Sequence, residues 1–485
     1  MRSYLVILVP CVILFFVFLM AQRPGAQVKT GSIETLRNPV RREGKHDPTV
    51  LSSTTSQAIH KGTEDALIGK GKYRCAVVID AGSTGSRIHA FKFEAEGEDL
   101  TLLDSTFKAI EPGLSSFATE PAEAGKSLIP LLEEAKKFVP DEIIGETTVE
   151  LRATAGLRML HPSEVQNILG EVESVLQSYP FKLLDDAVSV MDGSDEGVFM
   201  WVTSNYYLGN IGKRPEDTAS VIDLGGGSVQ RAFALGSAST LPPTVSSDSV
   251  RTISAGGQTY KVYVHSYLGY GLKAARMSFL RPFDTVHEGH PCITGGYLGR
   301  YHYVDENVNV KSDDEKGADV DKCLEIIERE MNLQEACDHG AGQCSFDGVW
   351  SGLTGHGGGS DKNYVSSYIV DIARDVGVIP RSSVKSAVVL KDFEDAGRKV
   401  CTMDYDTIKA DYGHYLNNNE DPPYVCMDVL YAYALLKEGF HLSPTKEFTL
   451  VKQFDYKGKK VEAAWSLGAA INTIGKHSLE EVMGN

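Results

Sequence analysis

The sequence predicts an α/β protein of two like domains that face each other across a cleft. The chain of 485 residues is too long for one small core, and its composition, 42% hydrophobic and 23% charged, is typical of a globular protein. The decisive observation is a repeat. Two apolar strands end in Asp80 and Asp223, and each aspartate opens a glycine-rich turn that leads into a second strand. A repeat at domain spacing indicates two copies of one structural unit.

The first copy of the repeat begins at Cys75. Residues 75–80 form a short β-branched strand, a Gly/Ser/Thr turn follows, and residues 87–93 return as a second strand. This pattern predicts a β-hairpin. Beyond the hairpin the periodicity predicts, in order, a mostly helical segment at 117–139, a strand at 147–154 and an amphipathic helix at 162–179.

The second copy follows a predicted helix. Ser194 is a good N-cap for a helix that runs to about residue 208, with Asp195 and Glu196 in its first turn. Residues 220–223 and 230–235 are the paired strands of the second hairpin. The later chain is predicted to contain mixed strand and helix at 240–291, a polar surface loop at 311–322, a glycine-rich mobile segment at 353–361, and helices at 427–436 and 463–474.

The two turns have the composition of phosphate-binding loops. Glycine lets the backbone amides approach a ligand closely, and successive N–H groups form an anion nest. Hydroxyl donors accompany the glycines in the first turn, and the second turn offers the same amides with fewer hydroxyls. No lysine follows as it does in a Walker A loop, so P-loop chemistry is excluded. The candidate phosphate-binding residues are Ser83, Thr84, Gly85, Ser86, Gly225, Gly226 and Gly227.

The two aspartates are candidate metal-site residues. Magnesium and calcium are hard cations that take carboxylate, water and phosphate oxygens. Facing turns would bring Asp80 and Asp223 together beside a bound polyphosphate, where they hold the cation directly or through water. An aspartate at one strand end is usually only a turn former, and one glycine-rich turn is usually a plain hairpin. The matched pair favours the metal and phosphate interpretation.

Hydrolysis of a phosphoanhydride also needs a base that activates water. Glu196 lies at the start of a helix, whose dipole is expected to keep it ionised and able to accept a proton. An acidic residue in a first helical turn is usually a capping device. Its position between the two phosphate turns makes Glu196 the candidate base.

Two stretches, VHSYLGYGLKAAR (264–276) and CSFDGVW (344–350), resemble the plant branch of the apyrases, or nucleoside triphosphate diphosphohydrolases. Five further motifs resemble this family as a whole. They are DAGSTGSR (80–87), ATAGLRML (153–160), GSDEGVFMWVTSNYYLG (193–209), DLGGGSVQ (223–230) and AWSLGAAI (464–471). The resemblance implies a two-domain actin/Hsp70/sugar-kinase-like fold of the ribonuclease H-like type, with an interdomain active-site cleft. It further implies domain I at 73–191 plus 462–485 and domain II at 192–461.

The resemblance also implies roles for individual residues. Glu196 matches the glutamate that activates the nucleophilic water, and Ser228 and Gln230 match residues that hold this water. Asp80 and Asp223 match the aspartates that hold Ca²⁺ or Mg²⁺ through its water shell, and Thr154 is similar. Two aromatic residues, Tyr368 and Tyr431, fall near the positions that contact the nucleotide base, although ordinary core packing explains each of them equally well. Arg87 follows the first loop and has either a site role or a structural one.

Cysteine usage favours export. Six of the eight cysteines lie in the C-terminal half of the chain without any CxxC pair, which favours three disulfides in an oxidising compartment over a thiolate zinc site. The alternative is six reduced cysteines in a cytosolic protein. Cys75 lies in an apolar strand and is expected to be a buried thiol. The resemblance suggests the pairs Cys292–Cys323, Cys337–Cys344 and Cys401–Cys426.

The N-terminus carries a candidate membrane segment. Residues 4–21 are almost continuously apolar, and residues 22–72 are rich in small and polar residues. We interpret 1–21 as an uncleaved signal anchor and 22–72 as a flexible stem, because Leu19 makes a poor signal-peptidase site. A cleaved signal peptide is the alternative. We therefore expect a single-pass type II membrane protein whose folded part faces the Golgi lumen or the outside of the cell.

The expected function is therefore metal-dependent hydrolysis of nucleoside tri- and diphosphates to the monophosphate by direct attack of water. The net charge of −17 argues against a nucleic-acid partner. Three alternatives share the motifs or the fold. They are a Golgi nucleoside diphosphatase selective for GDP or UDP, a slow nucleotide-binding switch or chaperone, and a sugar or polyol kinase, for which no acceptor-binding carboxylate is evident.

Overall fold

The computed structural model describes residues 73–96, 99–237, 249–284, 287–304, 306–313, 317–339, 343–352, 361–412 and 422–483, all within one compact unit, Ile33–Asn485. The predicted anchor at 1–21, the stem at 22–72 and residues 353–360 of the glycine-rich segment lie outside the described residues. Within the described ranges, every helix is too short or too polar to cross a membrane.

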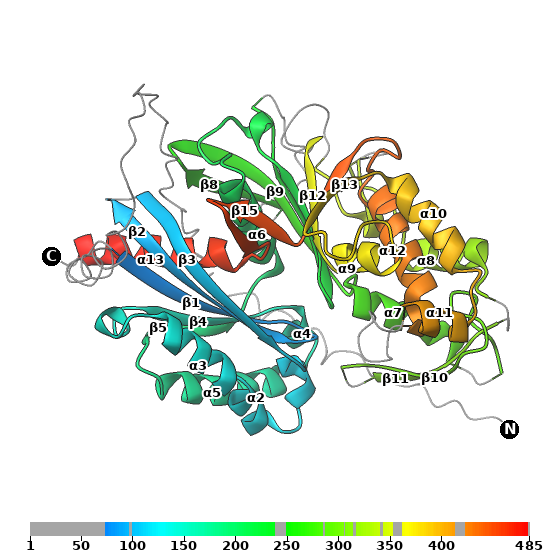
Figure 1. The fold of residues 1–485 in the computed structure, drawn as a ribbon, viewed down its shortest axis with the longest axis horizontal. Coiled ribbons are helices and arrows are strands. Elements are labelled where there is room, and N and C mark those ends of the chain that lie inside the picture. The colour runs from blue at the N-terminus through cyan, green and yellow to red at the C-terminus, as the bar shows by residue number, and fades with distance from the viewer. Residues whose placement is uncertain are drawn as a thin grey trace, which may run out of the picture. The chain divides into compact units, whose positions relative to one another are not determined.

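The first sheet has the strand order β3-β2-β1-β4-β5 (Figure 1). Its strands are β1 (Tyr73–Ala81), β2 (Ser86–Glu96), β3 (Asp99–Ile110), β4 (Thr148–Ala153) and β5 (Lys182–Val190). The strands β1, β2 and β3 pair antiparallel, whereas β4 and β5 are parallel to β1. One face is covered by α2 (Pro121–Ser127), α3 (Ile129–Phe138) and α5 (Pro162–Gln177), and short α4 (Ala155–Arg158) follows β4.

The second sheet repeats this topology and adds strands. Its order is β13-β14-β12-β6-β7-β9-β8, in which β6, β7 and β9 are antiparallel and β12 and β14 are parallel to β6. The segment β9-β7-β6-β12-β14 therefore has the same order and directions as the whole first sheet. The strands are β6 (Ser220–Leu224), β7 (Ser228–Ala234), β8 (Val250–Ala255), β9 (Gln258–Leu268), β12 (Asn363–Ser367), β13 (Lys385–Val388) and β14 (Phe448–Val451).

Helices and two small hairpins complete the second half. The helices are α7 (Leu272–Leu280), α8 (Val320–Glu330), α9 (Tyr368–Asp375), α10 (Leu390–Val400), α11 (Tyr405–Tyr412) and α12 (Val425–Ala434). The hairpins are β10–β11 (Leu298–Tyr303 and Glu306–Lys311) and β15–β16 (Gln453–Tyr456 and Lys459–Glu462).

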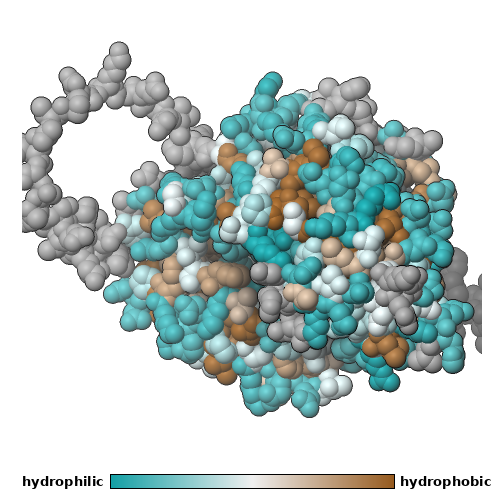
Figure 2. Space-filling model, turned by 45° about the vertical axis from the view of Figure 1, so that its right-hand side comes forward, coloured by the Kyte–Doolittle hydropathy of each residue, from teal (hydrophilic) through white to brown (hydrophobic). Residues whose placement is uncertain are grey.

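Figure 2 shows a mostly hydrophilic face with hydrophobic residues in separate patches.

Two helices connect the sheets. The helix α6 (Gly193–Tyr207) contacts β6, β7 and β9, and α13 (Ser466–Met483) contacts β1, β2 and α6 (Figure 1). Nearly all of α6 is buried, which explains why its sequence lacks a polar face. Trp201 of α6 packs in the same hydrophobic cluster as Val78 of β1 and Val221 of β6. This shared core fixes the start of α6 between the ends of both sheets.

Several predicted elements are displaced for local reasons. The helical segment predicted at 117–139 is divided into short helices, because Pro130 fits the first turn of α3 but not the interior of one continuous helix. The loop predicted at 311–322 ends early, because Asp319 caps α8 by accepting a hydrogen bond from the amide of Lys322. The helix predicted at 427–436 begins at Val425 and ends in a π-helical turn, Leu435–Gly439.

The cysteines pair as the resemblance suggested. Disulfides join Cys292 to Cys323, Cys337 to Cys344 and Cys401 to Cys426, and all lie in the second half of the chain. Cys75 is the buried free thiol expected in β1, and burial raises its pKa to about 12.

Candidate active site

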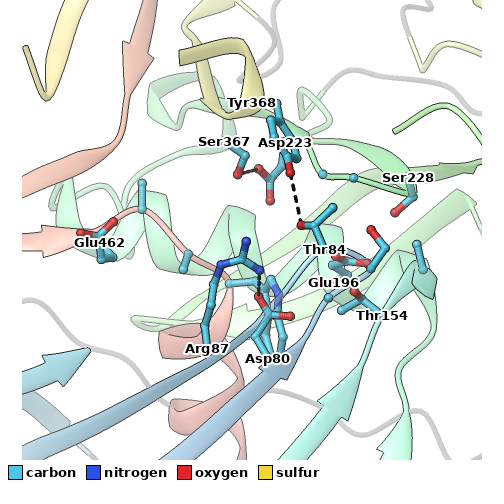
Figure 3. A pocket seen from close by; sticks show the side chains of 18 of the residues that line it. Asp80, Thr84, Arg87, Thr154, Glu196, Asp223, Ser228, Ser367, Tyr368 and Glu462 are labelled. Atoms are coloured by element: carbon cyan, nitrogen blue, oxygen red, sulfur yellow. Dashed lines mark hydrogen bonds and ion pairs between the residues drawn. The ribbon is translucent and has the colours of Figure 1, made fainter. Parts of the chain in front are cut away.

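A pocket of about 380 Å³ opens where the two repeated hairpins meet (Figure 3). The end of β1, the end of β6 and the start of α6 all contribute to its wall. Most of the predicted site residues line it, namely Asp80, Ser83, Thr84, Thr154, Glu196, Asp223, Gly225, Gly226, Gly227, Ser228 and Tyr368. Residues far apart in the sequence therefore form one site.

The two hairpin turns have the same internal geometry. In the first, the amide of Gly82 donates to the carbonyl of Gly85 at 3.0 Å, and in the second, the amide of Gly225 donates to the carbonyl of Ser228 at 3.0 Å. The amides between these ends donate to no backbone acceptor within the described residues. Buried N–H groups need a partner, so turns of this kind suit an anionic ligand.

The turns touch each other, and one glycine makes this possible. A Cβ at Gly226 would lie 2.4 Å from Oγ of Ser83 and 2.9 Å from Cγ2 of Thr84. Tyr368 at the start of α9 donates a hydrogen bond of 3.2 Å to Oγ1 of Thr84, so a second contact joins the two halves (Figure 3). The hydroxyls of the first turn are thereby held against the backbone of the second.

Two predicted phosphate-binding residues do not reach the pocket. Ser86 is fully buried, as the first residue of β2, and does not line the pocket. Gly85 also lies outside the lining, and a Cβ at this position would lie 2.7 Å from the carbonyl oxygen of Ile110. This position corrects the expectation that Ser86 binds phosphate. The alternation of side chains along β2 directs its side chain to a buried face of the sheet and away from the pocket. Gly85 contributes through its carbonyl, which closes the turn.

Asp80 is the penultimate residue of β1 and points into the pocket beside Arg87 (Figure 3). The guanidinium of Arg87 lies 3.7 Å from the carboxylate. Burial raises the pKa of Asp80 to about 6, while Arg87 lowers this pKa and Asp223 raises it. The carboxylate is thus a desolvated group for which a cation is favourable.

Asp223 occupies the equivalent place on β6. Oδ1 of its carboxylate accepts hydrogen bonds from Ser367 at 2.5 Å and from Ser366 at 2.8 Å, both on the neighbouring strand β12. Burial raises the pKa of Asp223, and the two hydroxyls lower it. The serines leave Oδ2 for other ligands.

The pocket fits a cation that keeps much of its water. The described residues contain no group of three or more His, Cys, Asp and Glu side chains arranged to hold a metal. Two carboxylates, Asp80 and Asp223, and the hydroxyl of Thr154 are hard oxygen donors in one pocket. Magnesium and calcium commonly complete such partial sets with water and phosphate oxygens.

Glu196 lies in the first turn of α6, as predicted, but the cap is different. The N-cap is Asp192, which accepts a hydrogen bond from the amide of Ser194 at 2.8 Å, so the predicted cap at Ser194 is wrong by two positions. Arg158 donates a hydrogen bond to Oε2 of Glu196. Burial raises the pKa of Glu196 to about 7, and Arg158 opposes this rise.

The expected helix dipole therefore does not decide the ionisation of Glu196. Burial dominates, and the charges of Asp80 and Asp223 raise its pKa further. A carboxylate of this kind changes its charge near neutral pH.

Gln230 connects Glu196 to a small hydrogen-bonded network. Its Nε2 lies 3.1 Å from Oε2 of Glu196, 2.7 Å from Oγ of Ser228 and 2.9 Å from Oγ of Ser266. Because an amide nitrogen carries two hydrogens, it shares them among these three acceptors. Ser228 lines the pocket, whereas Gln230 lies behind it and orients its neighbours.

The two candidate base-binding tyrosines have different surroundings. Tyr368 lines the pocket. Tyr431 is fully buried on α12, packs against Phe279 and donates its hydroxyl to the carbonyl of Tyr270 at 2.5 Å. Its position in the core corrects the expectation that Tyr431 contacts a nucleotide base.

Sequence reasoning missed the residues that hold the charged groups. Arg158, Ser266, Ser366 and Ser367 contact site residues through pairings between distant segments, and none has a distinctive local pattern. Arg158 lies within the ATAGLRML motif, which alone predicts no role for it. The outer pocket wall contains further unpredicted residues, including Phe107, Lys452 and Trp465.

The sequence model of the GDA1/CD39 (nucleoside phosphatase) family matches residues 67–484 of the chain. The chain belongs to the GDA1/CD39 family. It is similar to the probable apyrase 1 of Oryza sativa subsp. japonica, with 41% identity over 416 residues that cover 83% of each chain. It is also similar to the guanosine-diphosphatase of Candida albicans, with 34% identity over 440 residues, 83% of this chain and 71% of the relative.

A solved structure agrees with the fold of this GDA1/CD39 protein. The crystal structure of nucleoside triphosphate hydrolases from Neospora caninum matches with a TM-score of 0.58 at 14% identity, over 87% of this chain and 96% of that one. The predicted actin-like α/β fold is confirmed. The predicted domain bounds, 73–191 plus 462–485 and 192–461, stay a prediction. The predicted family, its plant-type branch and a hydrolase acting on phosphoanhydrides are confirmed as well.

Proposed function

We propose that this protein hydrolyses the terminal phosphate of nucleoside tri- and diphosphates, down to the monophosphate, by direct attack of a water that Glu196 activates. One observation carries the proposal. Glu196, Ser228 and Gln230 form a hydrogen-bonded group at a pocket with two buried aspartates. The pocket also contains two turns whose inner amides have no backbone acceptor among the described residues. A base, anion donors and metal-site carboxylates are the parts that phosphoryl transfer to water requires.

Glu196 suits the role of a general base. A base works best when its pKa lies near the working pH, and burial raises that of Glu196 to about 7. The carboxylate accepts the proton of the attacking water, while the hydroxyl of Ser228 fixes the position of that water. Gln230 fixes the positions of the Glu196 and Ser228 side chains relative to each other, because it contacts both.

The turns suit the substrate's phosphates. Amides between Gly82 and Gly85, and between Gly225 and Ser228, hold the terminal phosphate from both sides. Preorganised donors of this kind stabilise the charge that develops on the phosphoryl oxygens. Ser83 and Thr84 add neutral hydroxyl donors.

A divalent cation belongs to the proposal. Asp80, Asp223 and, through water, Thr154 would hold Ca²⁺ or Mg²⁺ next to the phosphates. The cation would supply charge neutralisation of the phosphate chain. Tyr368 remains our candidate for contact with the nucleoside.

The same site is compatible with narrower substrate use. The similarity to a guanosine-diphosphatase favours, as a second candidate, a Golgi diphosphatase selective for GDP or UDP. The similarity to the rice probable apyrase, at higher identity, favours a broad apyrase. Both candidate functions use the same site residues, so substrate turnover must separate them.

We also propose that the folded part works in an oxidising compartment, as a membrane-anchored protein that faces the Golgi lumen or the cell exterior. Three disulfides in the second half support this compartment, because cytosolic thiols are kept reduced. The apolar run at residues 4–21 supports the anchor.

A nucleotide panel tests the proposed function. Phosphate release is measured from ATP, ADP, GDP and UDP with divalent metal and then with chelator, in water enriched in ¹⁸O. We expect release from tri- and diphosphates, accumulation of monophosphate, loss of activity with chelator, and label in the released phosphate. Release from GDP and UDP alone would favour the diphosphatase. Phosphate transfer to a sugar, or no release, would refute the hydrolase.

A further inference from the structure

Arg158 lies directly behind the proposed base, and sequence reasoning gave it no role. We propose that Arg158 is a positioning residue for hydrolysis. It holds one carboxylate oxygen of Glu196, so that the other oxygen faces the attacking water. This inference rests on the proposed function of Glu196.

The contacts of the carboxylate are asymmetric. Nη2 of Arg158 and Nε2 of Gln230 both donate to Oε2 of Glu196, and within the described residues no side chain donates to Oε1. A carboxylate has two acceptor oxygens and accepts several hydrogen bonds. Because both protein donors use the same oxygen, the rotation of the carboxylate is fixed and Oε1 remains for the proton of the water.

Arg158 stands outside the pocket. Glu196 belongs to the pocket wall, whereas Arg158 does not. Nη1 of Arg158 lies against Gly193 at the start of α6, where a Cβ would be 2.8 Å from this nitrogen. The guanidinium therefore lies behind the carboxylate, away from the phosphate position. This placement favours a positioning role over a direct contact with substrate.

The pair also joins two structural elements. Arg158 ends α4, which follows Thr154 at the end of β4, and Glu196 is on α6. Both side chains are nearly buried, with 14% of Arg158 and 10% of Glu196 exposed. Removing one partner of a buried pair leaves an uncompensated charge. Without Arg158, the carboxylate would take up a proton or rotate, and either change disables a base.

The effect of losing Arg158 should appear in kcat. A residue that does not touch substrate contributes little to ground-state binding, so KM should change little. A positioned general base contributes about 10²- to 10⁴-fold to the rate. A misplaced Glu196 should therefore lose a large part of this rate enhancement.

Three variants test the inference, Arg158→Ala, Arg158→Lys and the matched control Arg152→Ala. Arg152 on β4 is buried to a similar degree, with 18% of its side chain exposed, and pairs with Glu150 away from the pocket. The readouts are kcat and KM for ADP with saturating metal, the thermal midpoint, and the response to guanidinium ions at concentrations that do not unfold the protein.

We expect kcat of Arg158→Ala to fall about 10²-fold with KM nearly unchanged. Added guanidinium should restore part of this kcat, because the free ion replaces the missing donor. Arg158→Lys keeps the charge but lacks the planar fork, so its kcat should be intermediate. Arg152→Ala should lose thermal stability only, and guanidinium should not change its kcat.

A kcat of Arg158→Ala equal to that of the unchanged protein would overturn the inference. The inference would also be overturned if guanidinium did not restore the kcat of Arg158→Ala and if the loss of kcat per degree of lost thermal midpoint were the same as in Arg152→Ala. If Arg158→Ala does not fold, Arg158→Lys carries the test, and an unchanged kcat in that variant overturns it. Full activity of Glu196→Gln would refute the proposed base itself, whereas an inactive Glu196→Gln beside a normal Arg158→Ala would overturn this inference alone.

Discussion

Ser367 donates a hydrogen bond of 2.5 Å to the carboxylate of Asp223 while its own backbone is in a left-handed conformation, with φ of 60°. A non-glycine residue in this region costs about 1–3 kcal/mol and is typical of functional sites. Glycine at position 367 would adopt this backbone conformation with less strain, but it would lack the hydroxyl that binds Asp223. The site retains the strain together with the hydrogen bond to a proposed metal-site residue.

This relationship predicts that substitutions of Ser367 differ in their effect on stability but share one effect on activity. Ser367→Gly should be more stable than Ser367→Ala by about 1 kcal/mol, since glycine tolerates the backbone conformation. Both variants should need more Mg²⁺ or Ca²⁺ for half-maximal activity, because the pKa of Asp223 rises further without the hydroxyl. Urea unfolding and metal titration of the activity measure these effects. An unchanged metal requirement in both variants would separate Ser367 from metal binding.

The pH dependence of activity follows from burial of Glu196. Its pKa is raised to about 7, and the base must be ionised, so kcat should rise with pH through about 7 and then level off. Asp80, with a pKa raised to about 6, titrates in the same pocket, so the acid limb belongs to the coupled carboxylates. Measuring kcat from about pH 5 to pH 9 tests this. A limb centred near the ordinary glutamate value of 4.5 would contradict it.

The same shift predicts a change in stability. The pKa of Glu196 is higher in the folded state than its ordinary value of 4.5, so the folded state binds more protons between pH 4.5 and about 7. The free energy of unfolding should therefore fall as pH rises through this window. Urea unfolding at both ends of the window measures the slope, and Glu196→Gln should reduce it. An identical slope in this variant would show that Glu196 has no raised pKa.

The contact between the phosphate turns predicts that Gly226 cannot be enlarged. In Gly226→Ala the new methyl group would lie 2.4 Å from Oγ of Ser83, so the side chains of Ser83 and Thr84 must leave their positions or the turns must move apart. A displacement of about 1 Å at a catalytic site costs roughly 10²-fold in rate. We expect kcat/KM to fall by about this factor. Gly170→Ala is the control, because a Cβ there meets nothing within 4 Å and its helix should become more stable.

The disulfides predict a loss of stability on reduction. Cys401 and Cys426 are separated by 25 residues, and a crosslink of this span contributes about 3 kcal/mol. The double variant Cys401→Ala with Cys426→Ala should lose about this much free energy of unfolding in urea. Cys75→Ala should lose less, since only one small buried thiol is removed. Equal losses would show that the crosslink is not what stabilises the fold.

The hairpins around Asp80 and Asp223 were predictable because their signal is local. A short apolar strand and a glycine turn lie within a few positions of each aspartate, and the structure forms both turns with the same hydrogen bond. The cap of α6 was less predictable. Asp192 and Ser194 are equally good capping residues, and the sequence pattern does not separate them.

Contacts between distant segments were not predictable. The partner of Glu196 is Arg158 on α4, and the partners of Asp223 come from β12, after more than one hundred intervening residues. Neither contact leaves a periodic trace in the sequence. Tyr431 rested on the resemblance alone, with core packing as an equal alternative, and the structure buries its side chain in the core. Burial depends on the whole fold.

The most direct test of a Glu196-activated water compares Glu196→Gln with Asp195→Asn. Asp195 shares the first turn of α6, but 52% of its side chain is exposed. With saturating nucleotide and metal, kcat of Glu196→Gln should fall by about 10²- to 10⁴-fold, nucleotide affinity measured by calorimetry should persist, and Asp195→Asn should remain active. Phosphate release by Glu196→Gln at the rate of the unchanged protein would contradict the account.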